Sequence, residues 1–247
     1  MKYQKKYTIH QYECGSDLKL TYSSLLNYMQ DIAAEHAAEL NAGILDLLKR
    51  GLTWMLSRYH LSIEKYPRYN ESVILKTWPS KHEGVFTLRE YTMERPDGEI
   101  LARMTSSFVI YDIKSKKIVN VEEHLFFEDS LISERAIDDD FPSLKLPKKV
   151  DHSQKILSRK HDIDFNRHVT NRALVEMAIE SVPMETLETH KLKDAQITFK
   201  GQAFYGDILE SQCDVIARKN SYKIIHHLIN KKNGDSILKM ETKWLRE

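Results

Sequence analysis

Hydrophobic and polar positions follow two different periods along the chain, and the same succession occurs twice. From Thr21 to Leu40 apolar residues recur every three or four positions, which predicts a helix with one buried face and a cap at Ser23 or Ser24. The next segments are rich in β-branched and aromatic residues and predict strands at 53–64, 71–81, 84–94 and 99–112. The stretch "ERPDGE" between the last two predicts a hairpin turn.

The second half of the chain repeats this order. It predicts a helix from Asn171 to Ser181 and strands at 195–200, 207–218, 222–232 and 236–245. "YPRYNESVIL" in the first half resembles "QAFYGDILES" in the second, which pairs Tyr69 with Tyr205. This internal similarity indicates two copies of one unit. Residues 122–150 carry many charges and two prolines, as expected of a linker.

Each predicted unit is one long helix followed by four or five antiparallel strands. Such a sheet has one apolar face, and a single helix laid across it is its simplest cover. This α+β arrangement is the hot-dog fold, and two tandem copies make a double hot dog. We expect an N-terminal hot-dog domain at 1–145 and a C-terminal one at 146–247.

A run of polar residues stands directly before the second helix. Within "RKHDIDFNRHVTN", Asp162, Asp164, Asn166 and His168 occupy alternate positions. An extended backbone would place all four side chains on one side of the chain. Two carboxylates, an amide and an imidazole in that order suit a reactive site, although a polar loop with a helix cap is the ordinary explanation.

Other readings of the polar residues are weaker. The run imitates the start of a calcium-binding loop, but Arg167 stands where glycine is required and Ala173 where glutamate is required. Adjacent histidines at 226 and 227 point to opposite faces of a strand. The two cysteines, Cys14 and Cys213, have no neighbours that would activate a thiol. We therefore expect no metal and no cysteine nucleophile.

Composition narrows the class of protein further. The 247 residues include 37 basic and 36 acidic ones, a balance that gives no general attraction to nucleic acid. No secretory signal begins the sequence, and no stretch of about 20 apolar residues predicts a membrane span. Two isolated cysteines suit a reducing compartment, so we expect a cytoplasmic protein. No glycine-rich phosphate loop or dinucleotide motif occurs, so we expect no cofactor.

Several separated segments resemble one known family, the plant and bacterial acyl-ACP thioesterases. They are "TWMLSRYHLSIEKYP" and "TWPS" in the first half, and "DIDFNRHVTN", "ESVPMETLETH" and "FYGD" in the second. The resemblance runs from about Tyr12 to Trp244. It implies hydrolysis of the thioester that joins a fatty acyl chain to the phosphopantetheine arm of acyl carrier protein (ACP), a reaction that ends fatty-acid synthesis.

The resemblance also implies an active site. The family's motif falls on Asp164, Asn166 and His168, and its usual glutamate falls on Gln202. Asp164 would activate water or attack the carbonyl directly, Asn166 would orient the thioester oxygen or the water, and His168 would protonate the leaving thiolate or polarise the carbonyl. The helix N-terminus after the motif suits an oxyanion. Because a glutamine cannot take a proton, Gln202 would only orient water.

Substrate-binding residues are expected in the first half, where this family holds the acyl tail. Met29, Ala33 and Trp54 are candidates for setting the depth of the pocket, and Arg58 is a further candidate contact. Sheet packing and a surface ion pair are the ordinary explanations for Trp54 and Arg58.

Basic residues gather between Lys145 and Arg172, where eight cations face three acids. Since ACP is strongly acidic, this excess would steer it toward the site. The expected ACP-binding residues are Lys148, Lys149, Arg159, Lys160, Arg167 and Arg172. The ordinary explanation is a solvated linker.

Two alternatives stay open at this point. The chain is an acyl-CoA thioesterase in one of them, and a non-catalytic acyl-ACP binding protein in the other, because Gln202 replaces the usual glutamate. The sequence leaves the preferred acyl chain length open, and also whether the chain forms a homodimer.

Overall fold

The computed structural model describes residues 1–125 and 127–246. The chain separates into two compact units, one from Met1 to Asp140 and one that begins at Phe141. The bounds expected from the sequence, 1–145 and 146–247, place the change five residues later.

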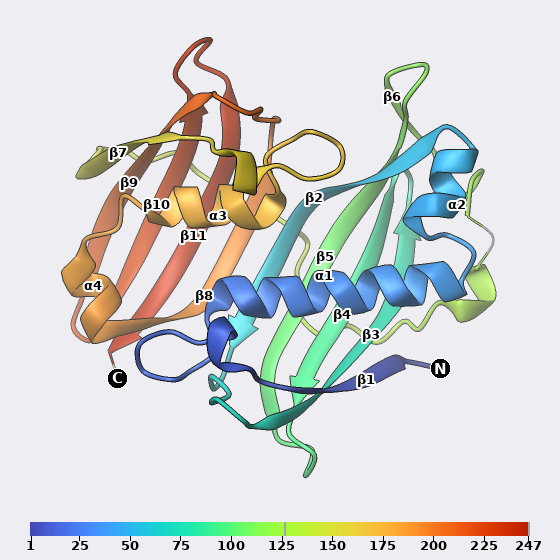
Figure 1. Ribbon diagram of the computed structural model, residues 1–247, viewed down its shortest axis with the longest axis horizontal. Helices are drawn as coiled ribbons and strands as arrows, with labels where there is room; N and C mark the ends of the chain where they lie inside the picture. The colour runs from blue at the N-terminus through green and yellow to red at the C-terminus, as the bar shows by residue number, and fades with distance from the viewer. Residues whose placement is uncertain (126, 247) are drawn as a thin grey trace. The chain divides into compact units, whose positions relative to one another are not determined.

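The first unit is an antiparallel sheet crossed by one long helix (Figure 1). Its strands lie in the order β1, β3, β4, β5, β2, and β6 pairs with the end of β5. The elements are β1 (Tyr3–Thr8), α1 (Tyr22–Glu39), α2 (Ile44–Lys49), β2 (Leu52–Ile63), β3 (Ser72–Glu83), β4 (Phe86–Glu94), β5 (Ile100–Asp112) and β6 (Lys117–Val119).

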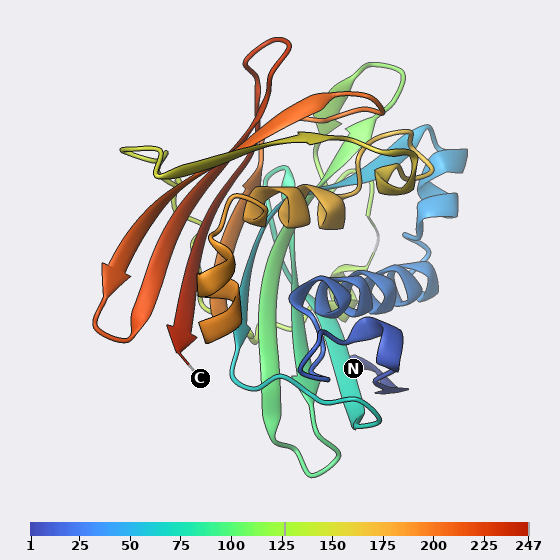
Figure 2. The same cartoon turned by 60° about the vertical axis from the view of Figure 1, so that its left-hand side comes forward.

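The second unit repeats the plan with a shorter helix over its sheet (Figure 2). Its strands lie in the order β8, β11, β10, β9, β7, all antiparallel. The elements are β7 (His152–Leu157), α3 (Asn171–Ile179), α4 (Met184–Thr189), β8 (His190–Phe199), β9 (Ile208–Arg218), β10 (Ser221–Asn230) and β11 (Ser236–Arg246). A helix on an antiparallel sheet in each unit confirms the predicted double hot-dog fold.

Helix α1 begins and ends at recognisable signals. Thr21 is its N-cap and accepts the backbone N–H of Ser24 over 3.1 Å, so the cap predicted at Ser23 or Ser24 was placed too late. At the other end Asn41 adopts a left-handed conformation with φ of 54°, and the N–H of Ala42 donates to the carbonyl of Ala37. The predicted helical face is confirmed, with Leu25, Met29 and Ile32 fully buried.

One polar pair is buried between α1 and the sheet. The guanidinium of Arg89 on β4 donates to Nδ1 of His36 over 3.0 Å. Because an arginine only donates, His36 must be the neutral acceptor. Burial and then the charge of Arg89 lower the pKa of His36 to about 4. The pair therefore ties the helix to the strand while His36 stays uncharged.

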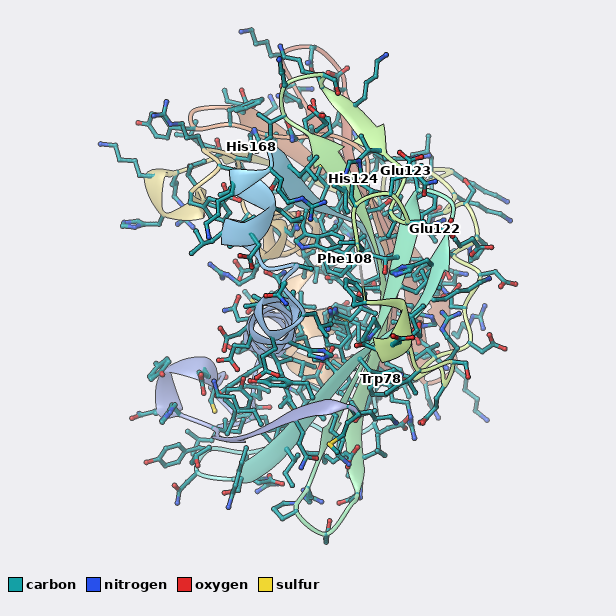
Figure 3. The ribbon with its side chains drawn as sticks, turned by 90° about the vertical axis from the view of Figure 1, so that its right-hand side faces the viewer. Trp78, Phe108, Glu122, Glu123, His124 and His168 are labelled. Carbon is teal, nitrogen blue, oxygen red and sulfur yellow. The ribbon has the colours of Figure 1, made fainter. Side chains whose placement is uncertain are left out.

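The opposite face of this sheet is covered by the segment 132–140. Glu90 is fully buried there and accepts from the guanidinium of Arg135 over 2.8 Å. Trp78, on the side of the sheet that faces away from α1, donates its indole N–H to the carbonyl of Glu134 (Figure 3). The predicted linker thus packs against the first unit over part of its length.

Helix α3 ends at Ile179, two residues before the predicted end, and Pro183 starts the next short helix. A chain of hydrogen bonds fixes its C-terminal end to the sheet. Nδ1 of His226 bonds the carbonyl of Ala178 over 3.0 Å, and its Nε2 bonds the hydroxyl of Thr242 over 2.8 Å. His226 is therefore a core residue, and burial lowers its pKa to about 4.

The elements that the sequence did not predict are short or polar. Strands β1 and β7 lie at the outer edges of their sheets and carry lysines and other polar residues instead of an apolar face. Helices α2 and α4 have only six residues each. In the part of the chain that the structure describes, no helix is both long and apolar enough to cross a membrane.

Candidate active site

The motif before α3 folds into a tight loop, which we call loop 164–168. The N–H of Asp164 donates to the carbonyl of His168 over 2.9 Å, and the N–H of Arg167 donates to the carbonyl of Asp164 over 3.0 Å. Arg167 is left-handed, with φ of 64°. The predicted extended run with all four polar side chains on one side is therefore wrong. The chain turns because the Asp164 side chain accepts N–H groups two and four residues ahead.

The carboxylate of Asp164 has one fixed and one available oxygen. Its Oδ1 accepts the N–H of Asn166 over 2.8 Å and that of His168 over 3.2 Å. Its Oδ2 has no hydrogen-bond partner among the described residues. A half-buried carboxylate held in this way keeps lone pairs free for a proton without having to reorganise.

Asp162 does not join the other members of the motif. It is buried, with its Oδ2 accepting the N–H of Arg159 over 2.7 Å at the start of a short 3-10 helix, Lys160–Asp162. Burial alone would raise the pKa of Asp162, but the hydrogen bonds and charge of Arg159 outweigh it and lower that pKa. Asp162 is a structural residue that shapes the approach to the loop.

A second segment, which includes Gln202, contacts loop 164–168 and the residue after it. The N–H of Val169 donates to the carbonyl of Ala203 over 2.8 Å, and the rings of His168 and Phe204 pack edge to face with centroids 5.1 Å apart. Ala203 is fully buried, whereas its neighbour Gln202 is exposed. Gln202 thus lies one residue from a direct backbone contact with Val169, the residue that follows the loop.

The turn after Gln202 is braced by residues that the sequence reasoning missed. The hydroxyl of Ser158 hydrogen-bonds the carbonyl of Phe204, and the carboxylate of Asp207 accepts the N–H of Phe204 over 2.9 Å. Asn230 donates its amide to the same carboxylate over 3.1 Å. The signal was present in "FYGD", because Gly206 adopts a positive φ of 83° and aspartate commonly accepts backbone N–H groups in turns.

Helix α3 starts at Asn171, three residues after His168. Its N-cap Thr170 accepts the N–H of Ala173 over 3.1 Å, and the N–H of Thr170 donates to the carbonyl of Asp162 over 2.8 Å. The first N–H groups of a helix have no partner within the helix and carry partial positive charge. Loop 164–168 therefore leads directly into a group of backbone donors.

The expected substrate-binding residues all belong to the first unit. Met29 and Ala33 lie one turn apart on the buried face of α1. Trp54 donates its indole N–H to the carbonyl of Ala42 over 2.8 Å and packs edge to face on Phe108. The guanidinium of Arg58 lies 4.5 Å from the centre of the Phe86 ring. The packing of Trp54 matches its ordinary explanation, whereas this contact of Arg58 is with an aromatic ring and is not an ion pair.

The six expected ACP-binding residues do not form one cluster. Lys148 donates its backbone N–H to the carboxylate of Asp214 on β9. This strand begins at Ile208, beside the turn that follows Gln202, and six residues of extended strand separate Ile208 from Asp214 by about 20 Å. Near loop 164–168, Arg159 pairs with Asp162. Two of the other expected residues also form ion pairs, Lys149 with Asp151 and Arg172 with Glu176. A further pair joins Lys231 and Glu210. Neither Lys160 nor Arg167 forms an ion pair with any described residue.

Both cysteines are free thiols. Cys213 is buried and donates to the carbonyl of Ser181, and burial raises its pKa. Burial also raises the pKa of Cys14. Because the reactive form of cysteine is the thiolate, both shifts disfavour a cysteine nucleophile.

Known proteins resemble the chain along its whole length. Residues 1–128 match the family profile of the acyl-ACP thioesterase N-terminal domain, and residues 146–246 match that of the C-terminal domain. A dodecanoyl-[acyl-carrier-protein] hydrolase of Cinnamomum camphora is 24% identical over 98% of this chain. A palmitoyl-acyl carrier protein thioesterase of Cuphea hookeriana is 27% identical over 98% of it. Both relatives are named as chloroplastic, and the matched regions cover 67% and 62% of their lengths.

A solved structure shares the fold. The 12:0-ACP thioesterase from Umbellularia californica superposes with a TM-score of 0.89 at 24% identity, covering 100% of this chain and 94% of the other. The two family profiles together account for most of the 247 residues. The chain belongs to the acyl-ACP thioesterase family.

Proposed function

We propose that the chain hydrolyses the thioester of fatty acyl-ACP to free fatty acid and holo-ACP, and so ends fatty-acid synthesis. The observation that carries this proposal is the Asp164 carboxylate, which is fixed through Oδ1 and available through Oδ2 beside His168 and the start of α3. Membership of the family, and the names of the relatives, support the choice of substrate.

In the proposed reaction, the residues of loop 164–168 act in successive steps. Asp164 takes a proton from a water molecule, whose oxygen attacks the thioester carbonyl. The negative charge that develops on the carbonyl oxygen is stabilised by the amide of Asn166 and the first N–H groups of α3. When the tetrahedral intermediate collapses, the C–S bond breaks and His168 donates a proton to the departing thiolate. The proton held by Asp164 then restores His168, directly or through water.

In this scheme Gln202 orients the attacking water and does not act as a base. Its amide neither gains nor loses a proton at ordinary pH, but it both donates and accepts hydrogen bonds. Being exposed and next to the segment that contacts the loop, it is suited to hold the attacking water. Asp164 is then the single base of the site.

The acyl chain is proposed to lie in the first unit, along the α1 face that carries Met29 and Ala33. Trp54 and Arg58 would bound that pocket through the positions that their packing fixes. The cytoplasmic location, the absence of nucleic-acid, metal and cofactor binding, and a homodimer stay predictions.

Release of free thiol and free fatty acid from purified acyl-ACP tests the proposed function. We expect turnover with acyl-ACP at low micromolar substrate, and much weaker turnover with the matching acyl-CoA. Equal efficiency on acyl-CoA would favour a CoA thioesterase. Tight binding of acyl-ACP without release of thiol would favour a binding protein in which Gln202 marks a lost activity.

A further inference from the structure

Three aromatic side chains stand in solvent on the two short segments that carry the reactive residues. Phe165 is 69% exposed in loop 164–168, and Phe204 and Tyr205, in the turn after Gln202, are 48% and 61% exposed. We call these three residues the aromatic rim. The two segments are joined by the bond from Val169 to Ala203 and by the contact of His168 with Phe204, so the rim adjoins the candidate site.

Two members of the rim, Phe165 and Tyr205, take no part in the contacts that close the loop and the turn. The loop is closed by backbone bonds and by the Asp164 carboxylate, and the turn is closed by Ser158 and Asp207. Phe165 and Tyr205 therefore expose large apolar surface that the local fold does not require. Grouped exposed aromatics are characteristic of surfaces that bind a partner.

The charges beside the rim indicate what kind of partner it fits. Lys160 and Arg167 flank it and form no ion pair with any residue that the structure describes. The nearby carboxylate of Asp162 is already occupied by Arg159. A surface of aromatic anchors with unpaired cations at its edge is complementary to an acidic protein that presents some apolar residues.

We propose that the aromatic rim is the docking surface for the acidic carrier protein that bears the thioester. This inference rests on the proposed function. Because the acyl group is tethered to the carrier by an arm of fixed length, the carrier has to rest next to the reacting groups, and the rim is the apolar surface that adjoins them. Phe165 and Tyr205 are its anchors, while Lys160 and Arg167 orient the acidic partner.

The test compares two substrates with the same acyl group, acyl-ACP and the acyl thioester of N-acetylcysteamine, which lacks the carrier. The variants are Phe165→Ser and Tyr205→Ser, with Ile216→Ser as the matched control because Ile216 is an exposed apolar residue elsewhere on β9. We expect each rim variant to raise the KM for acyl-ACP about tenfold, at least five times more than it raises the KM for the small thioester. The control should leave both values unchanged.

Several results would overturn the proposal. An unchanged KM for acyl-ACP in both rim variants would exclude docking there, and an equal rise with both substrates would assign the rim to the acyl group or to the loop. Loss of self-association, or of binding to anionic lipid vesicles, with the KM unchanged would assign the rim to a second copy or to a lipid surface. If the wild type hydrolyses neither substrate, the proposed function fails. Docking is then decided by the affinity of holo-ACP, which the rim variants should weaken about tenfold.

Discussion

Asp164 and His168 close the candidate catalytic loop on each other. The N–H of Asp164 donates to the carbonyl of His168 over 2.9 Å, and the N–H of His168 donates to the carboxylate of Asp164 over 3.2 Å. The same aspartate therefore shapes the loop with one oxygen and offers the other to a reactant. Because Asp164 has both roles, an informative variant must keep the hydrogen bonds that shape the loop and remove only the ability to accept a proton.

The role of His168 as a proton donor predicts a dependence on the leaving group. His168→Ala should lower kcat for acyl-ACP by about 10² to 10³, because an alkyl thiolate leaves poorly without a proton. The loss should shrink to about tenfold with an acyl thiophenol, whose thiolate leaves unaided. Steady-state rates with the two substrates measure the difference. An equal loss with both would mean that His168 polarises the carbonyl instead.

Gln202 is predicted to orient water without taking its proton. Gln202→Ala should lower kcat by about 10²-fold, as is typical when one positioned hydrogen-bonding group is removed from a site. Gln202→Glu should retain activity, since the exposed side chain has room for a carboxylate and the carboxylate also accepts from water. The rates of the three proteins at one pH provide the check, and an active Gln202→Ala would remove Gln202 from the site.

Unpaired cations near the loop should govern the salt dependence of substrate binding. Lys160→Gln and Arg167→Gln are expected to raise the KM for acyl-ACP several-fold at low salt and to flatten its rise with ionic strength. Lys148→Gln is the matched control, because Lys148 is bonded to the far part of β9. A control that behaves like the two variants would show that charge acts over the whole surface and not at the rim.

Two buried histidines predict how stability depends on pH. Burial lowers the pKa values of His36 and His226 to about 4, below the value of about 6.5 expected in the unfolded chain. The unfolded state therefore binds protons first as the pH falls, and the stability that is present above pH 6.5 is lost between about pH 6.5 and pH 4. The loss from His226 is about 3 kcal/mol at most.

The variant His226→Gln isolates one of these contributions. A glutamine amide can donate to the carbonyl of Ala178 and accept from Thr242 as the imidazole does, without titrating. Urea unfolding at pH 7 and pH 4.5 should show a smaller loss of unfolding free energy in the variant than in the wild type. An equal loss in both proteins would mean that other groups carry the pH dependence.

The sequence predicts the long helices and the apolar strands of this protein better than its edge strands and short helices. The long helix at 21–40, the second helix start and all eight apolar strands are recognisable because each buries one face and shows the corresponding period. Strands β1 and β7 were not predicted, since an edge strand rich in lysines and other polar residues shows no alternation of apolar and polar positions. Six-residue helices such as α2 are too short to show a period.

Local sequence patterns also predict only part of the candidate site. Alternation of Asp164, Asn166 and His168 marks the residues, but alternation alone implies a strand, and only the side-chain bonds of Asp164 explain why the chain turns. Gln202 is 34 residues further along the chain from His168, and the contact of Val169 with Ala203 joins two segments that lie outside the strands. Contacts of that kind cannot be read from local periodicity.

The kcat of Asp164→Asn on acyl-ACP tests the central claim most directly. An asparagine carbonyl can still accept the N–H groups of Asn166 and His168, so the melting temperature should stay within a few degrees of the wild type. The base is lost, and we expect kcat to fall by about 10³-fold or more. Near-normal turnover by a folded Asp164→Asn would contradict the account, because the residue would then shape the loop without activating water.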